Sequence, residues 1–285
     1  MKIYDFDKLV ESHQFSNTEA VLTIGVYDGF HTGHQRILKE TVALASAEGL
    51  KSVVITFSQN PKALTGRYLF SKPLMSERQM TRYLASLGVD YLVVIDFSPE
   101  FSKLSGEEFV ARCCTMFSVR AVVVGEDFHC GYKADTSVKE LKALVKRCSH
   151  EAKLIVPATY RLDDGRVNST TLVRELLTQG KVSQVETLLG RYYAVDLGQI
   201  PLKITGSSLS FVIEDAVQLL PPPGVYQTKL NLSDGSTLEV IAHLTPDSLN
   251  LAGEFNVESS ITYDYLEFVK EFIDDVDERD EESNC

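Results

Sequence analysis

Residues 24–35 read IGVYDGFHTGHQ. The apolar run Val21–Val26 predicts a buried strand that leads into this stretch, and Gly33–Glu48 predicts the helix that leaves it. Gly25 and Gly29 lack side chains, so the backbone between strand and helix can approach a ligand closely. A helix N-terminus offers free N–H groups and the positive end of the helix dipole, and this combination binds phosphate.

Two histidines, His31 and His34, lie in this stretch in the pattern H-x-G-H. Residues three apart share one side of a helical turn, so both imidazoles can donate to the phosphates of one nucleotide. Such donors stabilise charge that develops on phosphorus and on leaving pyrophosphate. Two other interpretations stay open: hydrogen-bonded structural histidines, and a zinc site that adds His129 and Cys130. A Walker P-loop is excluded because the sequence has no GxxxxGK[ST].

Apolar strand-like runs alternate with amphipathic helical stretches over the first two-thirds of the chain. The predicted strands are Val21–Val26, Ser52–Phe57, Tyr91–Asp96, Ala121–Gly125 and Lys153–Pro157. The predicted helices are Gly33–Glu48, Glu77–Leu87, Gly106–Phe117, Ser137–Cys148, Thr170–Thr178 and Val182–Leu189. Short strands rich in Val and Ile, without strict polar alternation, are typical of a parallel sheet covered on both faces. We therefore expect residues 1–190 to form an α/β domain with a Rossmann-like, doubly wound parallel sheet.

The sequence pattern changes after Gly190, where short apolar runs alternate with turn residues. Asp234–Gly235, between KLNLS and STLEVIA, predicts a hairpin. Residues 191–270 are therefore expected to form a second, smaller antiparallel domain resembling a β-barrel. The segment from about Tyr263 is interpreted as a helix that runs into an acidic tail at 271–285.

Composition narrows the class of protein. The net charge of −12 argues against nucleic acid as a partner. The five cysteines form no C-x-x-C pair, which favours reduced thiols. The start, MKIYDFDKLVESHQF, carries acids where a signal peptide has bases, and no apolar run approaches the roughly 20 residues that cross a bilayer. The sequence therefore predicts a soluble cytoplasmic protein that acts on small molecules away from membranes.

Five segments together resemble, in order, the bacterial bifunctional riboflavin kinase/FAD synthetase family over about residues 20–193. They are GVYDGFHTGHQ at 25–35, TFSQNP at 56–61, FSKLSGEEFV at 101–110, VVVGEDFHCG at 122–131 and STTLVRELLTQGKVSQVETLLGRYY at 169–193. The resemblance implies an H-x-G-H nucleotidylyltransferase that uses ATP and Mg²⁺ to adenylylate FMN, with FAD as the product.

The resemblance also implies roles for individual residues. The expected catalytic residues are His31, His34 and Arg174. The expected ATP-binding residues are Gly25, Tyr27, Asp28, Gly29, Gly33, Gly125, Ser169, Thr170 and Thr171. The expected flavin-binding residues are Thr56, Phe57, Asn60, Pro61, Asp127 and Phe128. Asp28 is in addition the candidate Mg²⁺ ligand.

Taken without the family, several of these residues have simpler interpretations. The segment STTLVR is typical of a capped helix with a surface arginine. Asp28 suits an Asx-turn as well as a metal shell. Phe57 suits ordinary core packing.

Two segments depart from the family pattern. Ser58, Gln59 and Asn60 stand where the family has Glu, Pro and often His. His129 and Cys130 replace aromatic or basic residues, so flavin contact from these two side chains is not expected.

The second domain departs further from the family. The stretch LSFVIED at 209–215 stands where the family's kinase domain has GFPTAN, so Ile213 and Asp215 replace its Thr and Asn. Isoleucine has no oxygen for a magnesium ion. The family segment with the catalytic acid is also missing, so we expect riboflavin kinase activity to be lost. Two rival functions stay open: the same fold acting on another phosphate ester, and a flavin- or nucleotide-binding protein without turnover.

Overall fold

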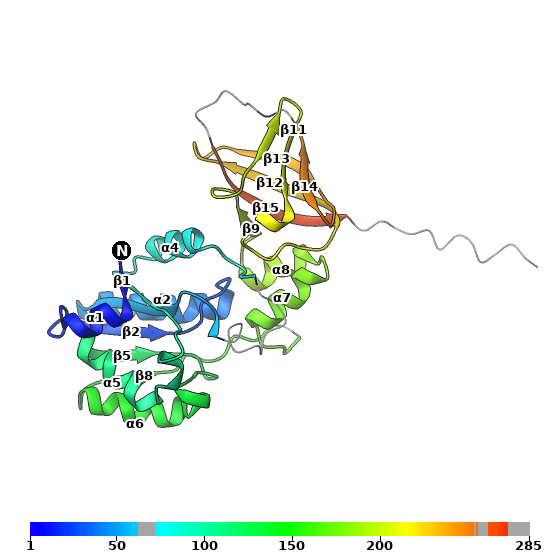
Figure 1. The fold of residues 1–285 in the computed structure, drawn as a ribbon. Coiled ribbons are helices and arrows are strands. Elements are labelled where there is room, and N and C mark those ends of the chain that lie inside the picture. The colour runs from blue at the N-terminus through cyan, green and yellow to red at the C-terminus, as the bar shows by residue number, and fades with distance from the viewer. Residues whose placement is uncertain (62–71, 163, 254, 256–261, 273–285) are drawn as a thin grey trace, which may run out of the picture. The chain divides into compact units, whose positions relative to one another are not determined.

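The computed structural model describes residues 1–285 except 62–71, 163, 254, 256–261 and 273–285. The chain forms two compact units, Met1–Thr170 and Thr171–Cys285 (Figure 1). The division falls earlier in the chain than the predicted boundary at residue 190. Helix α8 (Val182–Leu189) belongs to the second unit because it packs on β15 (Tyr263–Phe272), a strand of that unit's sheet.

A six-stranded parallel sheet forms the centre of the first unit, in the order β1-β4-β3-β2-β5-β8. Its strands are β1 (Lys2–Asp5), β2 (Glu19–Ile24), β3 (Lys51–Phe57), β4 (Tyr91–Ile95), β5 (Ser118–Val123) and β8 (Lys153–Ile155). The predicted parallel sheet is confirmed, and β1 is an additional edge strand that pairs with β4.

Helices cover both faces of this sheet (Figure 1). They are α1 (Phe6–Ser12), α2 (Thr32–Glu48), α4 (Glu77–Ser86), α5 (Gly106–Met116) and α6 (Val138–Cys148). Alternate β2 residues point to opposite faces: Leu22 packs in the cluster formed with α1, α5 and α6, whereas Val21 packs against α2. Helices α4, α5 and α6 each begin with a serine capping box, at Ser76, Ser105 and Ser137.

Short elements complete the first unit. They are η1 (Phe101–Lys103), β6 (His129–Cys130), η2 (Tyr132–Ala134) and β7 (Thr136–Ser137). The small β6–β7 ladder lies between β5 and α6 in the chain.

The second unit contains α7 (Thr170–Thr178), which begins at the last residue of the first unit, α8 (Val182–Leu189) and a seven-stranded antiparallel sheet. The sheet order is β10-β11-β14-β13-β12-β15-β9. The remaining bounds are β9 (Tyr193–Asp196), β10 (Lys203–Thr205), β11 (Ser208–Val212), η3 (Ile213–Asp215), β12 (Gly224–Leu232), β13 (Thr237–Leu244), β14 (Ser248–Ala252) and β15 (Tyr263–Phe272). The predicted hairpin is confirmed: β12 pairs with β13, and Gly235 in the turn has a φ of 86°.

The predicted helix from Tyr263 is wrong, because this segment is the strand β15. Its buried residues alternate at Leu266 and Phe268, and it pairs on both sides, with β12 and with β9. Glu271 therefore belongs to the strand rather than to an acidic tail. Its carboxylate accepts hydrogen bonds from the backbone N–H and the hydroxyl of Ser183, at 3.0 and 2.8 Å. Residues 273–285 of the predicted tail lie outside the described residues.

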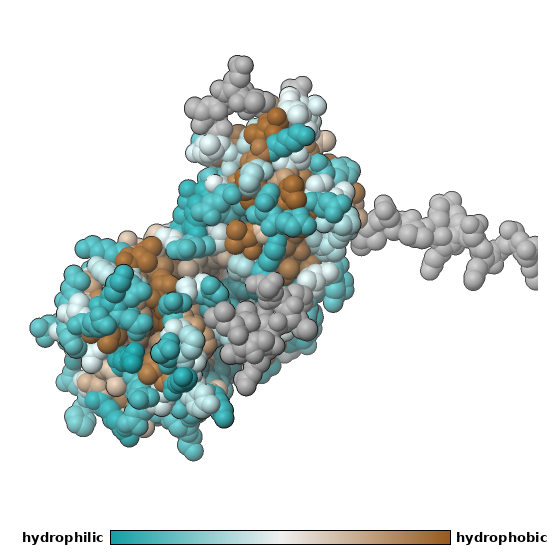
Figure 2. All heavy atoms as spheres, viewed as in Figure 1, coloured by the Kyte–Doolittle hydropathy of each residue, from teal (hydrophilic) through white to brown (hydrophobic). Residues whose placement is uncertain are grey.

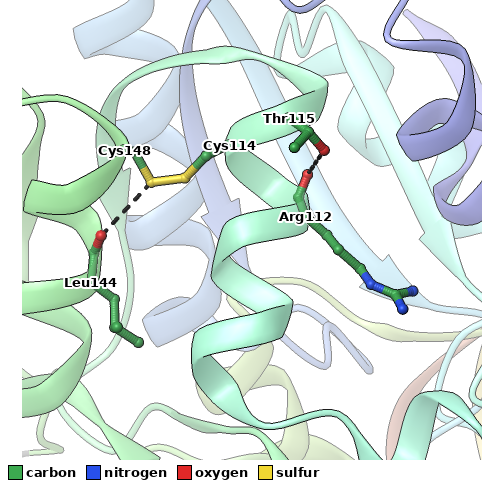
Figure 3. Close-up of a disulfide and its surroundings, with 5 residues drawn as sticks. All are labelled: Arg112, Cys114, Thr115, Leu144 and Cys148. Atoms are coloured by element: carbon green, nitrogen blue, oxygen red, sulfur yellow. Dashed lines mark hydrogen bonds between the residues drawn. A yellow bond between two sulfur atoms is a disulfide. The ribbon is translucent and has the colours of Figure 1, made fainter.

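The prediction that the cysteines are reduced thiols is wrong for one pair. Cys114 on α5 and Cys148 at the end of α6 form a disulfide, with their Cα atoms 5.5 Å apart (Figure 3). The two cysteines are 34 positions apart in sequence, and they meet because α5 and α6 pack against each other on one face of the sheet. Cys113 and Cys130 are free thiols.

The surface drawn in Figure 2 is largely polar, with apolar residues in scattered patches. Among the described residues, no helix is long and apolar enough to span a membrane.

Candidate active site

The H-x-G-H segment lies where the order of the parallel sheet reverses. From β2 the chain continues to β3 and β4 on one side, and it returns to place β5 on the other side of β2. The loops that leave β2 and β5 therefore diverge from neighbouring strands at the carboxyl edge. In open α/β sheets this crevice is where ligands bind.

A strained turn connects β2 to α2. Gly29 and Phe30 have φ values of 82° and 45°, and the left-handed region is unfavourable for a residue such as Phe30. The Phe30 ring is fully buried and stacks on Tyr83, with centroids 4.7 Å apart. The Gln35 side-chain amide donates to the Phe30 carbonyl at 2.9 Å. The stacking of Phe30 and the hydrogen bond from Gln35 stabilise the turn, and His31 directly follows it.

His31 is the N-cap of α2. Its Nδ1 accepts a hydrogen bond from the backbone N–H of His34 at 3.4 Å, which leaves Nε2 as the nitrogen that carries hydrogen in the neutral ring. Gly33 has a structural reason to be glycine: a Cβ there would lie 3.0 Å from the His31 ring. The two imidazoles stack, with centroids 3.8 Å apart at 27°.

Burial keeps both histidines neutral. It lowers the pKa of His31 from 6.5 to about 4, and the nearby Asp127 carboxylate offsets part of that effect. Burial also lowers the pKa of His34 well below its ordinary value, and the adjacent His31 adds to this. Neutral imidazoles can donate one hydrogen bond each without repelling one another.

The loop after β5 borders the same site. Asp127 interacts electrostatically with His31, and its Oδ1 would lie 2.9 Å from a Cβ at Gly125, so the Asp127 side chain lies close over that glycine. Asp127 is exposed, whereas Phe128 is half-buried against the core of the sheet. The structure thus brings Gly125 and Asp127 to the predicted phosphate site.

The segment before α7 contacts the turn between β2 and α2 and the first residue of α2. The Asn168 amide donates to the Thr32 hydroxyl at 2.6 Å, and the Thr170 hydroxyl donates to the Asp28 carbonyl at 3.4 Å. Asn168 is 4% exposed, and the sequence analysis missed it. The pattern N-S-T-T, with a fourth polar residue ahead of the helix, is the signal that could have indicated it. Ser169 lies between these two contacts.

Thr171 and Arg174 belong to the second compact unit. Arg174 is 2% exposed, so it is not the surface arginine of the simpler interpretation. Their roles toward the nucleotide stay predictions.

In this structure the Asp28 side chain stabilises the backbone of a neighbouring segment. Its Oδ1 accepts a hydrogen bond from the Leu74 N–H at 2.8 Å. Tyr27 is 5% exposed and its side chain points into the protein, so only its backbone remains for contact with a nucleotide.

Four of the predicted flavin residues, Thr56, Phe57, Asn60 and Pro61, lie at the carboxyl end of β3 and just beyond it, whereas Asp127 and Phe128 lie in the loop after β5. Thr56 is buried in the sheet, while Phe57 is partly exposed and meets the rings of Phe97 and Phe101. Both interpretations of Phe57 therefore remain, because an aromatic cluster at a strand end suits core packing and a planar ligand alike. Asn60 and Pro61 are half-buried.

A strained, glycine-containing turn at a switch point, followed by a histidine-capped helix, defines the class of α/β nucleotide-binding proteins with an H-x-G-H phosphate site. Comparison with known proteins makes the class specific. The model of the FAD synthetase family matches residues 13–171. The chain belongs to this family.

Three relatives share most of their length with the chain. A bifunctional riboflavin kinase/FMN adenylyltransferase of Listeria monocytogenes is 28% identical, over 79% of this chain and 72% of the relative. An FAD synthetase of the same organism is 29% identical, over 78% of this chain and 87% of the relative. A bifunctional riboflavin kinase/FMN adenylyltransferase of Escherichia coli K12 is 27% identical, over 74% and 67%.

Among solved structures, a macrolide-efflux protein from Streptococcus pneumoniae superposes with a TM-score of 0.77. It is 22% identical and covers 90% of this chain and 94% of its own. This likeness concerns the fold.

Proposed function

We propose that this chain is an FAD synthetase that transfers AMP from ATP to FMN and releases pyrophosphate. The observation that carries the proposal is the pair of stacked, neutral histidines at the N-terminus of α2, at the switch point of the sheet. Membership of the FAD synthetase family supports FMN as the acceptor.

The reaction is an in-line displacement at the α-phosphorus of ATP. An oxygen of the FMN phosphate forms the new P–O bond, and the bond to the β-phosphate breaks as pyrophosphate leaves. His31 and His34 donate hydrogen bonds to the phosphate oxygens as negative charge grows. The free N–H groups at the start of α2 add positive potential. The FMN phosphate is already ionised at neutral pH, so the attacking oxygen needs no catalytic base.

The proposal includes Mg²⁺, and the chain's residues fit a metal held mainly by substrate. The described residues contain no group of three or more His, Cys, Asp or Glu side chains that could hold a metal by themselves. Magnesium in phosphoryl-transfer sites is bound by one or two carboxylates together with substrate phosphates. Asp28 is the carboxylate that would hold it, and the ion would supply charge neutralisation.

For the other predicted residues we propose the roles that the family resemblance implies. Arg174 and Thr171 bind phosphates together with Ser169 and Thr170, and Phe57, Asp127 and Phe128 line the flavin side with Thr56, Asn60 and Pro61. We place the enzyme in the cytoplasm, in keeping with ATP as its substrate.

We further propose that the second unit lacks riboflavin kinase activity. The segment that replaces the family's metal-binding motif forms the end of β11 and the short helix η3, with Glu214 and Asp215 exposed. Two adjacent acids without the threonine oxygen disfavour a bound Mg-triphosphate.

Incubation of the purified protein with Mg-ATP and FMN, followed by chromatographic separation of the flavins, tests the main proposal. We expect FAD and one equivalent of pyrophosphate. If FMN stays unchanged while another phosphate ester is adenylylated, the assignment of FMN as the acceptor is wrong. If the protein binds FMN and ATP without any product, the chain is a binding protein rather than an enzyme.

A further inference from the structure

Among the described residues, nothing forms a hydrogen bond with the buried Nδ1 of the His34 ring that would orient it. In many functional histidines a carbonyl or carboxylate binds one ring nitrogen and thereby sets the orientation of the ring. The orientation of His34 must therefore come from packing.

Two rings supply this packing. His31 stacks on His34, and the Tyr27 ring meets His34 nearly at a right angle, with centroids 5.2 Å apart at 82°. Perpendicular aromatic contacts of this kind have a preferred geometry, because the positive edge of one ring meets the negative face of the other. The position of the Tyr27 ring thus constrains the plane of His34.

Tyr27 is itself attached to the sheet by two hydrogen bonds in series. The Thr23 hydroxyl donates to the Val123 carbonyl at 2.7 Å, and the Tyr27 hydroxyl lies 2.5 Å from Thr23 Oγ1. A threonine hydroxyl has one hydrogen, so Tyr27 is the donor to Thr23. Burial raises the pKa of Tyr27, which keeps this hydrogen in place. The ring lies over Gly25, where a Cβ would come within 3.0 Å of it.

We propose that Tyr27 is a positioning residue, which orients His34 through its ring and is held in place by the Tyr27–Thr23–Val123 link to strands β2 and β5. The inference rests on the proposed function of His34 as a phosphate donor. Tyr27 acts through another residue, because its own side chain is 5% exposed and its hydroxyl is already committed. The two linked strands, β2 and β5, pair with each other at the switch point, so the link connects the Tyr27 ring to the sheet at that point.

Four variants distinguish an effect of Tyr27 on the orientation of His34 from a simple loss of side-chain volume. Tyr27→Phe and Thr23→Val each break the link between the two hydroxyls and keep the ring, and Thr23→Ser is the matched control because it keeps the hydroxyl. Tyr27→Leu removes the ring and keeps an apolar side chain. Thermal melts of each variant establish that it is folded.

Steady-state FAD formation gives the first readout. We expect Tyr27→Phe and Thr23→Val each to lower kcat about fivefold, the fold-change for one lost hydrogen bond of about 1 kcal/mol, with KM for ATP changed less than about threefold. The double variant should be no worse than either single variant, because both break the same link. Tyr27→Leu should lower kcat by about tenfold or more, and Thr23→Ser should match the wild type.

Histidine ¹⁵N NMR of the protein without nucleotide gives a second readout that needs no activity. In Tyr27→Leu the pKa of His34 should rise toward its ordinary value as water reaches the ring, while Thr23→Ser should leave it unchanged. Folded variants with wild-type kcat, or additive effects in the double variant, would overturn the proposal. If wild-type protein makes no FAD, the proposed function fails, and the NMR titration still decides whether Tyr27 holds His34.

Discussion

At the scale of single residues, the proposed site contains two histidines that are stacked, neutral and placed at one helix end. Replacement of either His31 or His34 by Ala should lower kcat for FAD formation by about 10²-fold or more. This is the usual cost of losing one preorganised donor to a transition state. The measurement is steady-state kinetics with FMN and Mg-ATP. The control is His150→Ala, since His150 is exposed and, among the described residues, the Lys146 ammonium donates a hydrogen bond to its backbone carbonyl, which the substitution keeps. Wild-type turnover in both variants would return the histidines to a structural role.

The lowered pKa of His31 also makes a prediction about stability. In the unfolded chain this histidine titrates near 6.5, and in the folded protein near 4. Between these pH values the unfolded state binds a proton that the folded state does not, so its contribution to stability is complete above pH 6.5 and is lost as the pH falls toward 4. We expect this loss to reach about 3 kcal/mol.

Urea unfolding of wild type and His31→Asn between pH 7 and 4 measures this effect. Asparagine can still cap the helix but does not titrate. The free energy of unfolding should therefore fall more steeply with acidification in the wild type than in the variant. Parallel curves for the two proteins would show that the pKa of His31 is not shifted by folding.

At the scale of helices and strands, the sequence predicted those elements whose type is set by local residue pattern. Five of the six strands of the parallel sheet were identified by their composition, whereas β1 was not, and Ser76 and Ser105 mark helix starts. The strand at Tyr263–Phe272 was mistaken for a helix because its charged residues, such as Glu267 and Glu271, obscure the alternation of buried side chains. Its strand character comes from pairing with β12 and β9, which are distant in sequence.

The same limit applies to the site. The H-x-G-H segment is contiguous, so its position was predictable from strand, turn and helix signals alone. Asn168 was not predictable in this way, because it contacts Thr32, which lies 136 residues earlier in the sequence. Thr23 was equally hidden, since a threonine in a buried strand gives no sign that it links Tyr27 to Val123.

The disulfide between α5 and α6 makes a prediction at this scale. Cross-linking residues 34 positions apart should stabilise the first unit by about 3–4 kcal/mol through the unfolded chain. Urea unfolding of oxidised protein should therefore show a higher midpoint than the same protein with a phosphine reductant. The matched control is Cys114→Ser, whose midpoint should not respond to the reductant. A reductant effect of equal size in the variant would assign the change to some other group.

At the scale of the whole molecule, the chain consists of two compact units. The first unit carries the H-x-G-H site, and the family model covers residues 13–171 of the chain. The second unit keeps an antiparallel sheet, and hydrogen bonds such as those of Gln218 with Asp196 and Ala194 hold its strands in place. If the second unit lacks kinase activity, as we propose, the two activities of the bifunctional relatives are separable here.

The prediction is that this chain converts FMN to FAD but does not convert riboflavin to FMN. A kinase site needs a side-chain oxygen and a neutral amide near the metal of the triphosphate, whereas this chain presents Ile213 and Asp215 at η3 with Glu214 between them. The extra negative charge repels the triphosphate, and isoleucine cannot replace the missing metal ligand.

Incubation of the pure protein with Mg-ATP and riboflavin, beside a parallel reaction with FMN, measures both activities by separation of the flavins. Only the second reaction should yield product. Asp215→Asn, which restores a neutral amide at one position, should not rescue the first, because the groups of a catalytic site act as a unit and their effects do not add. Formation of FMN from riboflavin, abolished by Asp215→Ala, would instead identify the second unit as a divergent working kinase. In that case the acid at η3 would serve as the metal ligand that the family takes from its threonine.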